Sequence, residues 1–194
     1  MDSSFLVHYT RSCPGPWPGQ TIAEYCRSLV DGCENSAHTA FHTLHRILTE
    51  RLIRGSNRLT RGPERVVSFT ECLPGELNRL IKWHRGLIRW SFEPYGIAIR
   101  RKLLWILGAS QVVYGDEELY LRLPQDDKYR FQLLKSGGSD WSREKEWRLI
   151  GDLNLKDVAK ENFIVLVSEP HEAVIIEEAF DCPVALASYG TQTV

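Results

Sequence analysis

The sequence predicts an α+β fold, with a mixed, mostly antiparallel split β-sheet and flanking helices, in a single domain over residues 1–194. Short apolar segments of strand length are interspersed with longer segments in which apolar residues recur every three or four positions. The order of these segments lacks the regular strand–helix–strand repeat of a parallel α/β sheet. A length of 194 residues and a hydrophobic content of 43% are ordinary for one globular domain.

The first half of the chain has clear start and stop signals. A segment rich in proline and glycine follows the first strand, and proline supplies no N–H to a helix or a strand ladder. Thr21 and Glu24 have the spacing of a capping box, and Gly55 is a typical helix stop. The expected elements are a strand at 5–10, helices at 21–30 and 36–54, a strand at 65–70 and a helix at 76–89.

The second half contains several short segments rich in β-branched residues, which favour strands. Longer polar segments with spaced apolar residues separate them and indicate helices. The expected elements are a strand at 96–99, a helical turn at 102–107, a strand at 111–114, a helix at 126–135, strands at 141–150 and 163–167, a helix at 171–180 and a strand at 184–188.

The charge of the chain excludes some classes of partner. A formal net charge of -1 gives no overall basic field for nucleic acid, although basic clusters occur at 51–65 and 100–102. The N-terminal residues lack the pattern of a signal peptide, and no apolar segment reaches membrane-spanning length. The five cysteines show no paired zinc-binding spacing. We therefore expect a cytoplasmic protein with reduced thiols and no membrane partner.

The predicted strand at 141–150 carries the most informative residues. Side chains alternate along a strand, so Glu144, Glu146 and Arg148 are expected on one face. Trp147 and Leu149 would then point to the core. Such a row can hold a carboxylate at a fixed place in a cleft. An exposed edge strand with paired charges is the structural alternative.

Three motifs occur in a fixed order along residues 5–150: His8-Tyr9-Thr10, Ser68-Phe69-Thr70-Glu71, and Trp141-Ser-Arg-Glu-Lys-Glu-Trp-Arg148. This layout resembles the ADP-ribosyltransferase superfamily, and most closely the bacterial DUF2971 and AbiGi-type abortive-infection families. The resemblance implies a transferase that uses NAD as substrate and a protein or nucleic acid as acceptor. It also implies a role as a toxin or phage-defence effector, with a possible antitoxin as partner.

The resemblance assigns the catalytic role to the two glutamates. Glu146 would bind the nicotinamide-ribose hydroxyls and stabilise the positive charge that develops on the ribose carbon, and Glu144 would orient the acceptor. A carboxylate fixed in a water-poor cleft stabilises such a charge better than bulk water does.

The resemblance also assigns residues that bind NAD. His8 would bind the adenosine ribose with Tyr9 beside it, and Thr10 would bond the amide or ribose. Ser68 would lie at the nicotinamide pocket. The remaining roles are an aromatic surface for nicotinamide, from Phe69 or Tyr114, and a pyrophosphate clamp, from Arg51 or Arg54.

Two other functions fit the same residues. A non-catalytic module on this fold would bind a nucleotide, a nucleic acid or a protein, with Glu146 paired to Arg148. A metal-independent nuclease would use His8 and Glu146 and would degrade nucleic acid without NAD.

Two further clusters have simpler explanations. Cys33, His38, His42 and His45 lie near one another in sequence, but they complete no zinc motif. Because apolar residues occupy the buried face of this helix, we expect the histidines on its solvated side. Cys72 and His84 lack the third group of a nucleophilic triad.

Overall fold

The computed structural model describes residues 4–32, 38–58, 60–134 and 141–187. The chain divides into two compact units. Unit 1 comprises Met1–His8, Leu52–Leu73 and Ala98–Phe163, and unit 2 comprises Tyr9–Arg51, Pro74–Ile97 and Ile164–Val194. Both units contain helices and strands, so the α+β class is confirmed.

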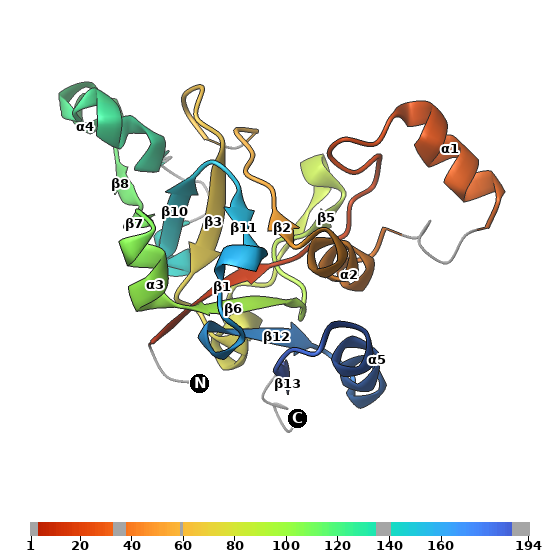
Figure 1. Cartoon of the computed structure of the whole chain (residues 1–194). Helices are drawn as coiled ribbons and strands as arrows, with labels where there is room; N and C mark the ends of the chain where they lie inside the picture. Colours follow the sequence, from red (N-terminus) through yellow and green to blue (C-terminus); the bar gives the residue numbers. More distant parts are fainter. Residues whose placement is uncertain (1–3, 33–37, 59, 135–140, 188–194) are drawn as a thin grey trace. The chain divides into compact units, whose positions relative to one another are not determined.

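The strands that lie wholly or mostly in unit 1 form a mostly antiparallel sheet in the order β6-β1-β3-β10-β7. Their bounds are β1 Phe5–Tyr9, β3 Val66–Thr70, β6 Gly96–Arg100, β7 Ser110–Gln111 and β10 Glu146–Ile150. The β3 strand pairs antiparallel with both β1 and β10, and β10 pairs antiparallel with β7. Figure 1 shows β3 and β10 side by side. The centre of this sheet positions the candidate site.

Shorter elements complete unit 1. The β2 strand, Leu52–Ile53, pairs antiparallel with β11, Leu153–Asn154, and β8, Val113–Gly115, pairs parallel with β9, Phe131–Leu133. Its α-helices are α3, Arg101–Ile106, and α4, Glu117–Arg122. The 3₁₀ turns are Gln125–Arg130, Trp141–Glu144, Leu155–Asp157 and Lys160–Asn162.

Gly55 is required by a close backbone approach in unit 1. A Cβ atom at this position would clash with the carbonyl oxygen of Gly151. The Gly55 N–H donates to Asp152 Oδ1 at 2.8 Å, and Arg65 donates to the Gly55 carbonyl. Gly55 therefore allows two segments of the backbone to pack closely. The expectation that it ends a helix is wrong, because α2 ends at Glu50.

Unit 2 contains the longer helices. They are α1, Ile22–Val30, α2, Ala40–Glu50, and α5, Pro170–Phe180. Its strands are a parallel pair, β12, Phe163–Val167, with β13, Val184–Leu186, and an antiparallel hairpin of β4, Trp83–His84, with β5, Arg89–Trp90. Leu44 and Ile176 are fully buried and contribute to its apolar interior. Two 3₁₀ turns, Pro74–Arg79 and Arg85–Leu87, flank β4.

Many of the expected elements are confirmed. The capping box of Thr21 and Glu24 opens α1, and the predicted strands at 5–10, 65–70, 96–99 and 163–167 appear within a residue or so of β1, β3, β6 and β12. The helix predicted at 36–54 is present as α2. It ends at Glu50 because Arg51 adopts a left-handed backbone conformation. Residues 36 and 37 lie outside the described part.

Three expected elements are wrong or only partly right. The helix predicted at 76–89 is a 3₁₀ turn followed by the β4–β5 hairpin. The helix predicted at 126–135 is a 3₁₀ turn followed by β9, and residue 135 lies outside the described part. The strand predicted at 141–150 begins only at Glu146. In the part of the chain that the structure describes, no helix is long and apolar enough to cross a membrane.

Candidate functional site

The segment before β10 fixes where the candidate site begins. Residues Trp141–Glu144 form a 3₁₀ turn, and Lys145 has a positive φ of 46°. The Thr70 hydroxyl donates to the Glu144 carbonyl, and the Glu71 N–H donates to the Lys145 carbonyl at 3.3 Å. Glu144 therefore lies outside the strand, so strand alternation does not place it on one face with Glu146 and Arg148.

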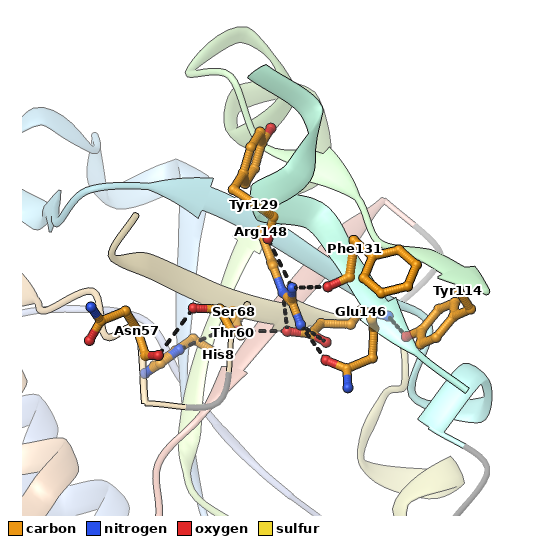
Figure 2. A network of polar contacts seen from close by, with 10 residues as sticks. His8, Asn57, Thr60, Ser68, Tyr114, Tyr129, Phe131, Glu146 and Arg148 are labelled. Carbon is orange, nitrogen blue, oxygen red and sulfur yellow. Dashed lines mark hydrogen bonds and ion pairs between the residues drawn. The ribbon is translucent and has the colours of Figure 1, made fainter. Parts of the chain in front are cut away.

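Arg148 is the buried centre of a polar network in unit 1 (Figure 2). Its side chain is only 2% exposed. The Nη1 group donates to the carbonyl oxygens of Tyr129 at 2.9 Å and Phe131 at 3.0 Å, and Nη2 donates to Gln132 Oε1 at 2.8 Å. Nε and Nη2 also donate to the two carboxylate oxygens of Glu146, at 2.9 Å and 3.1 Å. These contacts use the five N–H groups of the guanidinium, which makes its burial tolerable.

Glu146 receives a third hydrogen bond from the neighbouring strand. Ser68 lies opposite Arg148 in the β3–β10 register, and its Oγ donates to Glu146 Oε1 at 2.7 Å. Oε1 therefore accepts two hydrogen bonds, whereas Oε2 accepts one from the described residues. A carboxylate oxygen has two lone pairs, and the side chain is 16% exposed. Glu146 is thus held in one orientation with capacity for one more donor.

His8 extends the same network from the adjacent strand β1. Its Nδ1 lies 2.9 Å from the Ser68 carbonyl oxygen, and its ring packs edge-on against Phe69 with centroids 5.9 Å apart. Because a carbonyl only accepts hydrogen bonds, Nδ1 carries the proton, and Nε2 is the acceptor in the neutral ring. His8, Ser68 and Glu146 come from three neighbouring strands, and Figure 2 shows them in succession along the network.

Tyr114, on β8, contacts the backbone of Glu146. Its hydroxyl accepts a hydrogen bond from the Glu146 N–H at 3.3 Å. Burial of the phenol is the largest cause that raises the pKa of Tyr114 to about 12, and the charges of Glu146 and Glu144 raise it further. The hydroxyl is therefore neutral at physiological pH.

Replacing Tyr114 by phenylalanine tests this environment. A tyrosine with a folded-state pKa above its unfolded value contributes stability that is complete below about pH 10 and is lost as the pH rises through the folded pKa. The stability advantage of the wild type over Tyr114→Phe should therefore shrink between about pH 10 and pH 12. Urea unfolding of both proteins across this range measures the difference. A constant difference would contradict the raised pKa.

The remaining predicted residues of unit 1 differ in exposure. Phe69 is 2% exposed, so its ring belongs to the core, and Tyr114 is the better placed of the two aromatic candidates. Arg54 is exposed beyond β2, where a guanidinium can reach a ligand in solvent.

The other three predicted NAD-binding residues belong to unit 2. Tyr9 is 6% exposed and packs edge-on against Phe92 with centroids 5.6 Å apart. Thr10 is 2% exposed, and its hydroxyl donates to the Ala40 carbonyl at 2.8 Å. Arg51 is half-buried at the end of α2. The structure brings together His8, Ser68 and Glu146 within unit 1, and the roles of these three residues remain predictions.

The histidine cluster is more buried than expected. His38 is 2% exposed and stacks on Trp17 with ring centroids 3.6 Å apart, so its expected place on the solvated side is wrong. His42 and His45 are half-buried, and Cys33 lies outside the described residues. Within the described ranges, no group of three or more His, Cys, Asp or Glu side chains is arranged to hold a metal ion.

Sequence reasoning missed the partners of Arg148. Two are backbone carbonyls, of Tyr129 and Phe131, which every residue carries and no motif can reveal. The third, Gln132, lies on β9, in a segment whose polar composition predicted a helix. The burial of Arg148 is seen only in the structure, and it is this burial that requires partners for the charge.

No protein-family model, no curated protein and no solved structure matches the chain.

Proposed function

We propose that the chain transfers ADP-ribose from NAD to a macromolecular acceptor, with Glu146 as the carboxylate at the reacting ribose. The observation that supports this most directly is the contact chain from His8 through Ser68 to Glu146. It joins residues separated by 60 and by 78 positions in sequence. These are the residues to which the resemblance assigns NAD binding and catalysis.

The reaction needs a fixed negative charge. The bond between the ribose C1′ and the nicotinamide nitrogen breaks, and the electron pair leaves with nicotinamide. The acceptor nucleophile bonds to C1′ and releases its proton, with water as acceptor in the hydrolytic case. Positive charge develops on the ribose in between, and a preplaced carboxylate stabilises it without reorganisation.

Each member of the contact chain has a defined task in this proposal. The Ser68 hydroxyl and the Arg148 guanidinium hold Oε1 of Glu146, which leaves the second lone pair of Oε2 for a ribose hydroxyl. His8 would bind the adenosine ribose from the neighbouring strand. Tyr114 would provide the aromatic surface for nicotinamide.

Nicotinamide release from NAD by the purified chain tests the proposal. The wild type should release nicotinamide, and Ser68→Ala should lower the rate by about tenfold or more, since it removes a hydrogen bond to a charged group. Ser110→Ala is the matched control, because Ser110 also lies opposite Arg148, on the other flank of β10. Absence of both turnover and an NAD-induced rise in melting temperature would overturn the proposal.

A non-catalytic binding module is the second candidate. Glu146 is paired with an arginine that is 2% exposed, and such a pair can serve a structural purpose alone. This candidate predicts that NAD or another nucleotide raises the melting temperature. It also predicts that no nicotinamide is released, whether or not an acceptor is added.

A further inference from the structure

The β4–β5 hairpin of unit 2 exposes three large apolar side chains. Trp83 is 48% exposed, Trp90 is 46% exposed and Ile88, between them in the connecting loop, is 67% exposed. Single exposed apolar residues are common, but a cluster with two tryptophans marks an interaction surface.

The base of the hairpin is fixed by Ser91, which is 7% exposed. The Ser91 N–H donates to the Lys82 carbonyl at 2.8 Å, and the Lys82 N–H donates to Ser91 Oγ at 2.8 Å. Ser91 Oγ also donates to the Leu80 carbonyl at 2.8 Å. Trp83 and Trp90 lie directly opposite each other, with ring centroids 5.4 Å apart at 71°. The exposed tryptophans thus stand on an anchored support.

Ile88 is unfavourable at its position by two criteria. Its φ of 51° lies in the left-handed region, where glycine or asparagine is preferred and a β-branched residue is strained. Its side chain is also mostly in solvent, so core packing does not compensate for the strain. A contact outside the chain would account for isoleucine here.

The hairpin and the residues just before it are rich in basic residues, in a segment bounded by Glu76 on one side and Glu93 on the other. From Leu77 to Ser91 the sequence contains Arg79, Lys82, Arg85 and Arg89, together with His84, and no aspartate or glutamate. Lys82 and Arg85 are exposed. The hairpin therefore combines a local positive charge with exposed tryptophan and aliphatic groups, in a chain whose net charge is -1.

We propose that the β4–β5 hairpin docks on an anionic phospholipid surface. Tryptophan favours the headgroup level of a bilayer, aliphatic groups favour the acyl boundary, and lysine and arginine are attracted to anionic headgroups. Single-stranded nucleic acid would also use the tryptophans and the cations, but it gives Ile88 no partner. The sequence led us to expect no membrane partner, and the vesicle experiment below decides between that expectation and this proposal.

Sedimentation of the full chain with vesicles tests the docking surface. The wild type should sediment with phosphatidylcholine vesicles that contain phosphatidylglycerol, more weakly with phosphatidylcholine alone, and less as salt rises. Trp83→Ala and Trp90→Ala should each weaken binding by about tenfold. Trp105→Ala is the matched control, because Trp105 is a 65% exposed tryptophan on α3 of unit 1, and it should bind as the wild type does.

A second variant separates binding from folding. Ile88→Gly relieves the left-handed backbone strain, so the thermal stability should be kept or raised while vesicle binding falls by about tenfold. Three results would overturn the proposal: no vesicle binding by the wild type, equal loss of binding in Trp105→Ala, or binding of single-stranded RNA, but not of vesicles, that depends on Trp83 and Trp90.

Discussion

Replacing Arg148 by methionine is expected to lower the free energy of unfolding by about 3–5 kcal/mol. The side chain is 2% exposed, so the variant removes five hydrogen bonds from partners that water hardly reaches, and Glu146 keeps only the one from Ser68 among those described. These partners are the carboxylate of Glu146, the amide of Gln132 and the carbonyls of Tyr129 and Phe131. A buried polar group that loses its hydrogen bond costs its full desolvation free energy.

Urea unfolding of the wild type and Arg148→Met measures this effect. Arg122→Met is the matched control, because Arg122 pairs with Glu118 on the surface, where the two side chains are 69% and 75% exposed, and should change stability by less than about 1 kcal/mol. In a Glu146→Gln background the cost of Arg148→Met should fall, since no unpaired carboxylate remains. Equal costs in both backgrounds would show that the ion pair contributes nothing to the network.

The sequence predicts the buried strands well because their signal is local. The apolar residues of β1, β3, β6 and β12 exclude a solvated helix, and the β-branched content favours a strand. The alternation of β10 also places Glu146 and Arg148 on one face, as their ion pair shows. The α1 helix is predicted because its capping box is a local hydrogen-bond pattern.

The features that the sequence does not reveal depend on contacts and backbone conformations that the spacing of apolar residues does not encode. The β4–β5 hairpin replaces a helix because Trp83 pairs with Trp90 and Ile88 takes a left-handed conformation, neither of which apolar spacing encodes. Glu144 lies outside the strand, where its carbonyl accepts a hydrogen bond from Thr70 at the end of β3. Thr70 is some 70 residues earlier in the sequence, so no local pattern predicts this contact.

Glu146→Gln is expected to lower the rate of nicotinamide release by about 10²–10³-fold under the proposed function. Glutamine keeps the shape of the side chain but removes the charge that stabilises the ribose in the transition state. The substitution also replaces one of the two accepting oxygens by an N–H₂ group, which donates only. The side chain can then no longer accept hydrogen bonds from Ser68 and Arg148 at both terminal atoms. The affinity for NAD should change less than the rate, because the charge on the ribose exists only in the transition state.

The control for this variant is another glutamate bound by an arginine. Glu117 accepts from Arg61 Nη1 with both carboxylate oxygens, at 2.7 Å and 2.6 Å, and its side chain is 58% exposed. Glu117→Gln should leave nicotinamide release unchanged. Circular dichroism of Glu146→Gln at the assay temperature shows that the fold is kept, because loss of the Arg148 ion pair will itself lower stability. A folded Glu146→Gln protein with wild-type turnover would place the reaction elsewhere and leave Glu146 as the structural partner of Arg148.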